Sequence, residues 1–327
     1  MMYHSTRTTE DVKSFEDVAM STYAAKGGLY VPSDIPKLSE DTFQSWKDFS
    51  FPQVCANILA LFSNIELNEL LAITNEAFSL FNDGADPLPL TKVGGTYFLD
   101  TSLGPTFAFK DIGQQMLGRI LNHILGRKSK RATILVETSG DTGPAAIAGV
   151  KGCQNVEIFC LYPHGRVSSV QELQMVTNPD SNVHIYRTDG NTDEQASLLK
   201  QIFADQTFVA DHNICSVNSI NWVRIAAQSS YYVWAYVQMK YHKEMTCDEV
   251  DFVIPTGAFG NAMGGYLAKL MGVPIGRIYC ATNVNDIVHR TIQTGDMRMS
   301  ENVPVSTFYP FFFQCLPIYI LFFIMCL

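Results

Sequence analysis

The chain has 327 residues, of which 47% are hydrophobic and 17% are charged, and its formal net charge is −9 at pH 7. This length and composition predict an ordinary globular protein that buries a sizeable core and holds more than one folded unit. The negative charge argues against nucleic acid as the main partner, because binding a phosphate backbone requires a basic surface.

The eight cysteines are scattered along the sequence, and none of them forms a Cys-x-x-Cys pair. Several lie in apolar runs, as Cys160 and Cys280 do, which is typical of reduced, buried thiols in a cytosolic or organellar enzyme. Neither a disulfide framework nor a zinc site is therefore expected. The first six residues contain no apolar signal core, so we expect a cytoplasmic protein, with an organelle as the alternative location.

Residues 1–85 are predicted to form a small, mainly helical domain. Apolar residues recur at helical spacing over residues 51–61 and 67–81, and a shorter amphipathic stretch covers residues 14–20. Residues 82–87 (Asn-Asp-Gly-Ala-Asp-Pro) have the composition of a turn or linker, so we expect the first domain to end there.

A lysine stands inside an apolar and aromatic octapeptide at residues 104–111 (Gly-Pro-Thr-Phe-Ala-Phe-Lys-Asp), just where a helical segment at 112–125 begins. Burying an ammonium group is costly, and desolvation lowers the pKa of a lysine until its neutral amine becomes available as a nucleophile. Such a lysine can form a Schiff base with a carbonyl group or with pyridoxal phosphate. The alternative interpretation is that Lys110 packs its stem at a helix start and keeps its charge in water.

From Leu88 onward, short apolar strands alternate with helices. The predicted strands lie at residues 133–137, 156–161, 183–187, 250–254 and 277–280. Predicted helices separate these strands. The first follows residue 143 and ends at residue 150, and the others cover residues 168–177, 193–204, 221–240 and 261–271. This alternation predicts an α/β fold with parallel sheets covered by helices, and ligand sites at the C-terminal ends of the strands.

Two glycine-containing loops each follow a predicted strand and precede a predicted helix. The first covers residues 138–143 (Thr-Ser-Gly-Asp-Thr-Gly), and the second covers residues 255–261 (Pro-Thr-Gly-Ala-Phe-Gly-Asn). Backbone N–H groups at a helix N-terminus bind anions, and glycine lets a ligand approach the backbone closely. Each loop is therefore a candidate site for a phosphate or a carboxylate, and a plain capped strand-to-helix turn is the alternative.

The second loop also resembles a dinucleotide-binding loop through Gly257, Gly260, Gly264 and Gly265. Its spacing departs from G-x-G-x-x-G, however, and the next strand ends at residues 281–283 (Ala-Thr-Asn) without the acidic residue that would hold a ribose. An NAD-dependent enzyme is therefore the weaker hypothesis.

Residues 308–327 are almost wholly apolar. A helix needs about 20 such residues to span a bilayer, so a membrane anchor is one interpretation of this tail. Pro310 and Pro317 and the absence of basic residues beside the run argue against an anchor. A buried closing segment and an alternative end of the chain are the other interpretations, and we favour the last because the α/β domain stops partway.

Lys110 and the two loops together fit a pyridoxal-phosphate site. Such a site needs a lysine for the aldehyde of the cofactor, one loop for its phosphate and one loop for a substrate anion. The octapeptide and the two loops, in this order, resemble the signatures of the threonine synthase family. The resemblance extends to about residue 304 and is closest to the animal threonine synthase-like 2 group. The further motifs that carry it lie at residues 3–7, 27–32, 171–175, 218–222 and 285–290.

The resemblance implies a role for each residue that matches the family's motifs. Lys110 would form the Schiff base with pyridoxal 5′-phosphate and would move the α proton of the substrate. The cofactor phosphate would be held, chiefly by main-chain N–H groups, at Gly257, Ala258, Phe259, Gly260 and Asn261. The amino-acid substrate would be bound by Thr138, Ser139, Gly140, Asp141 and Thr142. No metal ligand is implied.

The resemblance also implies a fold-type II, tryptophan synthase β-like enzyme with an N-terminal domain at residues 1–85 and a catalytic domain at 86–305. The expected activity is that of a phospho-lyase on O-phosphohomoserine or O-phosphothreonine, which gives 2-oxobutyrate, ammonia and phosphate. A threonine synthase proper and a non-catalytic isoform that binds a partner or is tethered to a membrane are the alternatives. The expected partner is thus a small phosphorylated amino acid, and a homo-oligomer is compatible with the family.

This sequence departs from the family pattern in three places. Leu103 stands where the family commonly has a histidine, and Ala258 stands where it often has an asparagine. The family also continues well past residue 305, whereas residues 306–327 do not resemble that continuation. We therefore expect the C-terminal part of the large domain to be missing and assign no role to residues 306–327.

Overall fold

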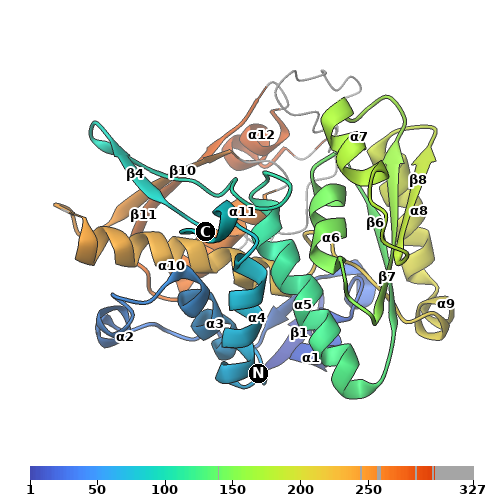
Figure 1. The fold of residues 1–327 in the computed structure, drawn as a ribbon, viewed down its shortest axis with the longest axis horizontal. Coiled ribbons are helices and arrows are strands. Elements are labelled where there is room, and N and C mark those ends of the chain that lie inside the picture. The colour runs from blue at the N-terminus through green and yellow to red at the C-terminus, as the bar shows by residue number, and fades with distance from the viewer. Residues whose placement is uncertain (139, 244, 256–258, 284–285, 297, 299–327) are drawn as a thin grey trace.

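A small N-terminal sheet and four helices precede the α/β part of the chain (Figure 1). The computed structural model describes residues 1–138, 140–243, 245–255, 259–283, 286–296 and 298. The N-terminal sheet is antiparallel with the order β2-β1-β3 and consists of β1 (Met2–Ser5), β2 (Thr8–Ser14) and β3 (Tyr30–Pro32). The helices are α1 (Phe15–Ala19), α2 (Glu40–Ser45), α3 (Phe51–Phe62) and α4 (Leu67–Phe78).

Helices α3 and α4 confirm the predicted helical spacing, and the small sheet adds what the spacing did not predict. Helix α3 begins with a capping box, in which the backbone N–H of Ser50 donates to Gln53 Oε1 at 2.7 Å. The hydroxyl of Tyr3 donates to the carbonyl of Phe62 at 2.6 Å and so ties β1 to the end of α3. Strand β2 is mostly polar and none of its residues is fully buried, so its sequence lacks the alternation that signals a strand.

The larger part of the chain is organised around a four-stranded parallel sheet with the order β8-β7-β6-β9. Its strands are β6 (Ala132–Glu137), β7 (Val156–Pro163), β8 (Val183–Thr188) and β9 (Ile214–Cys215). The helices around it are α5 (Lys110–Lys128), α6 (Thr142–Val150), α7 (Ser169–Val176), α8 (Thr192–Ala204) and α9 (Gln206–Asp211). Figure 1 shows α6 and α7 on one face of the sheet and α8 and α9 on the other. The predicted parallel, helix-covered sheet is thus confirmed.

A second parallel pair, β10 (Val250–Pro255) and β11 (Ile275–Ala281), belongs to the same α/β alternation. It packs with α10 (Trp222–His242) and α11 (Gly260–Leu270), and α12 (Ile287–Thr294) follows. A hairpin of β4 (Leu90–Val93) and β5 (Thr96–Leu99), which the sequence patterns did not predict, precedes α5.

Cys160 is a buried, free thiol, as its apolar run predicted, and the free thiols of Cys55, Cys153 and Cys215 are buried as well. The same expectation is wrong for Cys280, which is only partly buried, because β11 has only β10 as a neighbouring strand among the described residues. Burial raises the pKa of Cys160 to about 12, so this thiol stays protonated and unreactive at neutral pH. Within the described ranges, no helix is both long and apolar enough to cross a membrane. The apolar run at residues 308–327 lies outside the described residues.

Candidate active site

A tight turn before α5 brings Lys110 to its place, and the next residue, Asp111, holds this turn. The buried Asp111 carboxylate accepts hydrogen bonds from the backbone N–H of Thr106 at 2.8 Å and from its Oγ1 at 2.6 Å. Burial raises the pKa of Asp111, and the two Thr106 donors partly offset this shift. Phe107 in the same turn has a φ of +57°, a left-handed conformation that is unfavourable for a residue with a β carbon. The carboxylate contacts therefore stabilise the turn from which α5 begins.

Lys110 is the first residue of α5, and its side chain is buried. Its Nζ donates to Asp141 Oδ1 at 2.6 Å and to Thr142 Oγ1 at 2.9 Å. Burial lowers the pKa of Lys110, whereas the Asp141 carboxylate opposes this shift; the nearby Arg224 lowers the pKa further. The expectation of a buried lysine at the start of a helix is thus confirmed, and its amine is held between two acceptors.

Those two acceptors belong to the loop that joins β6 to α6. Asp141 caps α6 and Thr142 is its first residue, and both are buried. Because the N-terminus of a helix carries partial positive charge and unpaired N–H groups, this end of α6 is suited to binding an anion next to Lys110.

Thr138 fixes the shape of the same loop. Its Oγ1 accepts hydrogen bonds from the backbone N–H groups of Gly140 at 3.0 Å and Gly143 at 2.8 Å. Gly140 has a φ of +142°, and a β carbon there would collide with the side chain of Gln171. The loop therefore requires glycine at 140. Ser139 lies outside the described residues.

Glu137, the last residue of β6, places a buried carboxyl group directly before this loop. Burial raises its pKa to about 7, and a hydrogen bond with Asn218 opposes this shift. The group therefore changes its charge near neutral pH, at the C-terminal end of a central strand.

The second predicted loop leads into the N-terminus of α11. Phe259 caps this helix with a φ of +67°, and Gly260 and Asn261 form its first turn. The Oδ1 of Asn261 accepts hydrogen bonds from the hydroxyls of Tyr231 at 2.5 Å and Tyr232 at 2.6 Å. The two tyrosines of α10 thus fix the first turn of α11. Gly257 and Ala258 lie outside the described residues.

Gln228 of α10 links the first turn of α5 to the first turn of α11. A β carbon added at Gly113 would lie 3.4 Å from Gln228 Nε2, and one added at Gly260 would lie 3.4 Å from Gln228 Oε1. The Oε1 atom is buried and accepts no hydrogen bond from the described residues. A buried acceptor without a donor is unfavourable, so its position between the two helices is suited to a polar ligand group.

The sequence patterns did not single out Arg224, Gln228, Tyr231 and Tyr232 as site residues. All four lie on α10 and are buried, so their aromatic and apolar neighbours make the segment indistinguishable from an ordinary core helix. The Asn-Ser-Ile-Asn-Trp motif at residues 218–222, which opens α10, was the one available signal.

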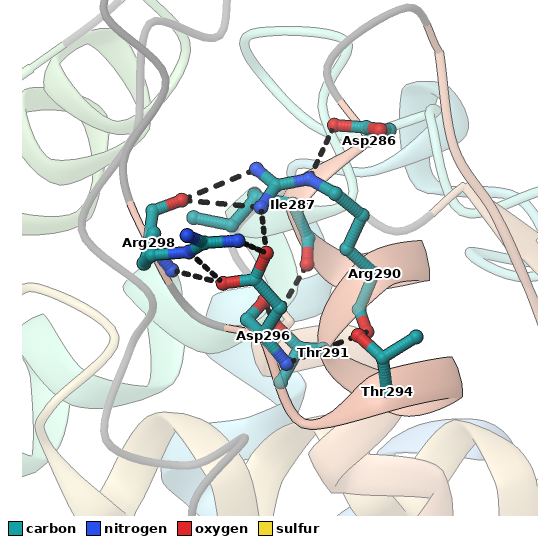
Figure 2. Close-up of polar contacts among 7 residues, drawn as sticks. All are labelled: Asp286, Ile287, Arg290, Thr291, Thr294, Asp296 and Arg298. Carbon is teal, nitrogen blue, oxygen red and sulfur yellow. Dashed lines mark hydrogen bonds and ion pairs between the residues drawn. The ribbon is translucent and has the colours of Figure 1, made fainter.

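The motif at residues 285–290 is described from Asp286 onward, and its last four residues form the first half of α12. Figure 2 shows that Arg290 contacts Asp286 before the helix and Asp296 after it. Arg290 Nε donates to Asp286 Oδ1 at 2.9 Å, and its Nη1 lies 3.2 Å from Asp296 Oδ2. Arg298 also binds Asp296, with Nε–Oδ1 and Nη2–Oδ2 distances of 2.9 Å, and its hydrogen bonds lower the pKa of Asp296. The described contacts of this motif are therefore structural.

The arrangement fits pyridoxal 5′-phosphate. Lys110 supplies a buried amine that can condense with an aldehyde, and the N-terminus of α11 can receive a phosphate. Gln228 Oε1, which accepts no hydrogen bond within the described part of the chain, lies between these two elements. The N-terminus of α6, beside the lysine, offers a second anion site for a substrate.

Two family models match almost the whole chain. The model described as "Threonine synthase N terminus" matches residues 2–78, and the one described as "Pyridoxal-phosphate dependent enzyme" matches residues 85–307.

Individual relatives agree with these matches. The chain is 40% identical to a threonine synthase from Schizosaccharomyces pombe and 41% identical to a threonine synthase-like 2 protein from Xenopus laevis. These alignments cover 93% and 92% of this chain, but 61% and 64% of the relatives. The chain thus spans less than two thirds of the length of these relatives.

Solved structures show the same relationship in three dimensions. The structure of pyridoxal-phosphate-bound threonine synthase from Brucella melitensis superimposes with a TM-score of 0.87 at 35% identity, covering 98% of this chain and 68% of that one. Threonine synthase from yeast gives a TM-score of 0.84 at 36% identity, covering 94% of this chain and 64% of that one.

Proposed function

The chain belongs to the threonine synthase family of pyridoxal-phosphate-dependent enzymes, and from this premise we propose that it eliminates phosphate from a phosphorylated amino acid. Its cofactor is pyridoxal 5′-phosphate, and its fold is the fold-type II α/β fold. The proposed substrates are O-phosphohomoserine and O-phosphothreonine. Each molecule reacts with one water to give 2-oxobutyrate, ammonia and inorganic phosphate.

The observation that carries the proposal is the buried amine of Lys110, held 2.6 Å from Asp141 and 2.9 Å from Thr142. When bound, the cofactor supplies an aldehyde for the amine and a ring that withdraws electrons from the α carbon of the substrate. In the proposal, Lys110 accepts the α proton in its neutral form. Its lowered pKa supports this role, because less free energy is needed to hold the amine unprotonated.

The two helix N-termini have separate roles in the proposal. The main chain at 257–261, including Phe259, Gly260 and Asn261, binds the cofactor phosphate. The loop of Thr138, Ser139, Gly140, Asp141 and Thr142 binds the substrate. The hydrogen bonds from Tyr231 and Tyr232 to Asn261 and those within the β6–α6 loop support this division, because each holds a helix N-terminus rigid.

We also propose that the chain consists of two domains, an N-terminal domain at 1–85 and a catalytic domain at 86–305. The boundary between the two family matches, at residues 78 and 85, supports this position.

A threonine synthase proper is the second candidate, because the chain is as similar to a protein of that name as to a threonine synthase-like 2 protein. The two reactions share proton removal by Lys110 and loss of phosphate. They diverge in where water reacts: its addition to the carbon skeleton yields threonine, whereas hydrolysis of the carbon–nitrogen bond yields 2-oxobutyrate and ammonia.

The test is a product assay on the purified chain loaded with pyridoxal phosphate. O-Phosphohomoserine and O-phosphothreonine are supplied separately, and phosphate, 2-oxobutyrate and threonine are measured. The proposal predicts equal amounts of phosphate and 2-oxobutyrate, which Lys110→Ala abolishes and Lys130→Ala, at an exposed lysine after α5, leaves unchanged. Threonine as the main product would favour the second candidate. A chain that binds no cofactor would favour the non-catalytic alternative.

A further inference from the structure

A small polar pocket lies on the far side of α5 from the turn that carries Lys110. Its walls come from three elements: Glu76 of α4, Arg119, Asn122 and His123 of α5, and Lys151 after α6. Its volume is about 220 Å³. Pockets for drug-sized ligands measure about 300–1,000 Å³, so this one suits a smaller molecule.

The pocket combines two cations with one carboxylate, on a chain whose net charge is −9. The Arg119 side chain is 13% exposed, and its Nε lies 3.4 Å from Glu76 Oε1. Glu76 and Lys151 are 71% and 60% exposed, so both can move toward a ligand. Lys151 has a distant partner in Asp180, at 3.9 Å. The mostly buried Arg119 side chain is therefore held in place, whereas the exposed side chains of Glu76 and Lys151 can change conformation.

One face of α5 carries three buried side-chain nitrogens, and two of the residues concerned, Arg119 and His123, line the pocket. The third is Gln115, whose Oε1 accepts a hydrogen bond from Arg119 Nη1. Gln115, Arg119 and His123 follow one another at intervals of four residues and so lie on one face of the helix. Among the described residues, Gln115 Nε2, Arg119 Nε and His123 Nε2 are buried and make no hydrogen bond of normal geometry. Their nearest carboxylates are distant: Arg119 Nε lies 3.4 Å from Glu76 Oε1, and His123 Nε2 lies 3.8 Å from Glu69 Oε2. Buried donors with only distant acceptors are unfavourable, so a ligand that brings acceptor oxygens to Arg119 stabilises this face.

We propose that this pocket binds a small α-amino acid as its zwitterion. The α-carboxylate lies against Arg119 and Lys151, since a guanidinium matches the planar geometry of a carboxylate. The α-ammonium group pairs with Glu76. A small apolar side chain faces Ile73 and Cys153, which also line the pocket. Inorganic phosphate fits less well, because Glu76 would repel a doubly charged anion.

The pocket and the candidate active site share two helices. Lys110 begins α5 and Thr142 begins α6, whereas Arg119 lies nine residues further along α5 and Lys151 directly follows α6. At a rise of 1.5 Å per residue, Arg119 is roughly 13 Å along α5 from Lys110. The backbones of α5 and α6 touch at Gly118 and Gly149. An amino acid that fastens α4 to this pair of helices therefore changes how freely their N-termini move.

The proposal has two parts: the amino acid binds in the pocket, and its binding changes the rate of the elimination. Only the second part rests on the proposed function. Binding is measured by calorimetry on the full chain loaded with pyridoxal phosphate, with L-valine as the probe. An amino acid that enters the active site changes the visible absorbance of the cofactor, whereas one that binds in the pocket does not. The proposal predicts heat of binding from L-valine without a matching absorbance change.

Three comparisons test the residues and the ligand class. Arg119→Gln and Glu76→Gln each weaken this binding by at least about tenfold, whereas Lys130→Gln leaves it unchanged. The hydroxy analogue 2-hydroxy-3-methylbutyrate, which lacks the ammonium group, binds at least about tenfold more weakly than L-valine. Because Glu76 is 71% exposed, its variant tests the pocket even where Arg119→Gln disturbs folding.

The proposal is overturned if L-valine gives no such heat, or if both pocket variants bind it like the unmodified chain. Equal or tighter binding of the hydroxy analogue or of inorganic phosphate would also overturn it. If binding is confirmed but L-valine leaves the elimination rate unchanged, the regulatory part alone is wrong. If the chain shows no elimination activity at all, the proposed function fails while the binding result still stands.

Discussion

The close contact between α5 and α6 leads to a prediction about Gly149, a residue far from any reacting group. A β carbon added at Gly149 would lie 2.5 Å from the backbone oxygen of Gln114. The obstacle is main chain and not the end of a flexible side chain, so the helices must move apart to accept Gly149→Ala. This movement would also disturb the N-termini that carry Lys110 and Thr142.

Two opposing effects set the size of the change. Alanine is favoured over glycine inside a helix by about 1 kcal/mol. Overpacking in a well-packed core costs about 1–3 kcal/mol, and a backbone obstacle places Gly149→Ala at the upper end of this range. The free energy of unfolding should therefore fall by about 2 kcal/mol.

Gly126→Ala is the matched control on α5, because the nearest atom to its added β carbon would be Asn155 Nδ2 at 3.8 Å. It should raise the free energy of unfolding by about 0.5–1 kcal/mol through helix propensity alone. Urea unfolding of both variants and the unmodified chain, followed by circular dichroism, measures the difference. A Gly149→Ala variant as stable as Gly126→Ala would refute the close packing of α5 on α6.

Two further predictions concern Glu137 and the tyrosines of α10. The folded pKa of Glu137, about 7, exceeds its ordinary value of 4.5, so the folded chain retains a proton that the unfolded chain releases. As pH rises from about 4.5 to about 7, the free energy of unfolding of the unmodified chain should thus fall relative to that of Glu137→Gln, by up to about 3 kcal/mol. Urea melts at several pH values measure this difference, and a difference that stays constant with pH would contradict the prediction. Replacing Tyr231 and Tyr232 together with phenylalanine should weaken cofactor binding by about tenfold, because Asn261 loses both hydroxyl donors. Titration with pyridoxal phosphate checks this, with Tyr236→Phe as control, and unchanged affinity in the double variant would count against it.

Local sequence signals predicted the α/β part of the fold and the position of Lys110. The strands at 133–137, 156–161 and 183–187 were recognisable because each is a short apolar run bounded by turn residues. The octapeptide at 104–111 identified a buried lysine at a helix start, since apolar neighbours and the start of a helical pattern are both local features.

Contacts between distant segments were beyond the reach of such patterns. The pairing of Tyr3 with Pro32 and the hydrogen bond from Tyr3 to Phe62 join residues that no periodicity connects. Likewise, Tyr231 reads as a core residue until the fold places its hydroxyl beside Asn261. Strand β9 is two residues long, too short for any alternation to be visible.

The most direct test of the account is to find the lysine that carries the cofactor. The chain loaded with pyridoxal phosphate is treated with borohydride, which reduces a Schiff base to a stable amine, and is then digested and analysed by mass spectrometry. A single modified peptide is expected, with the cofactor on Lys110, and this peptide should carry no modification in Lys110→Ala. Modification of another lysine, or none, would contradict it.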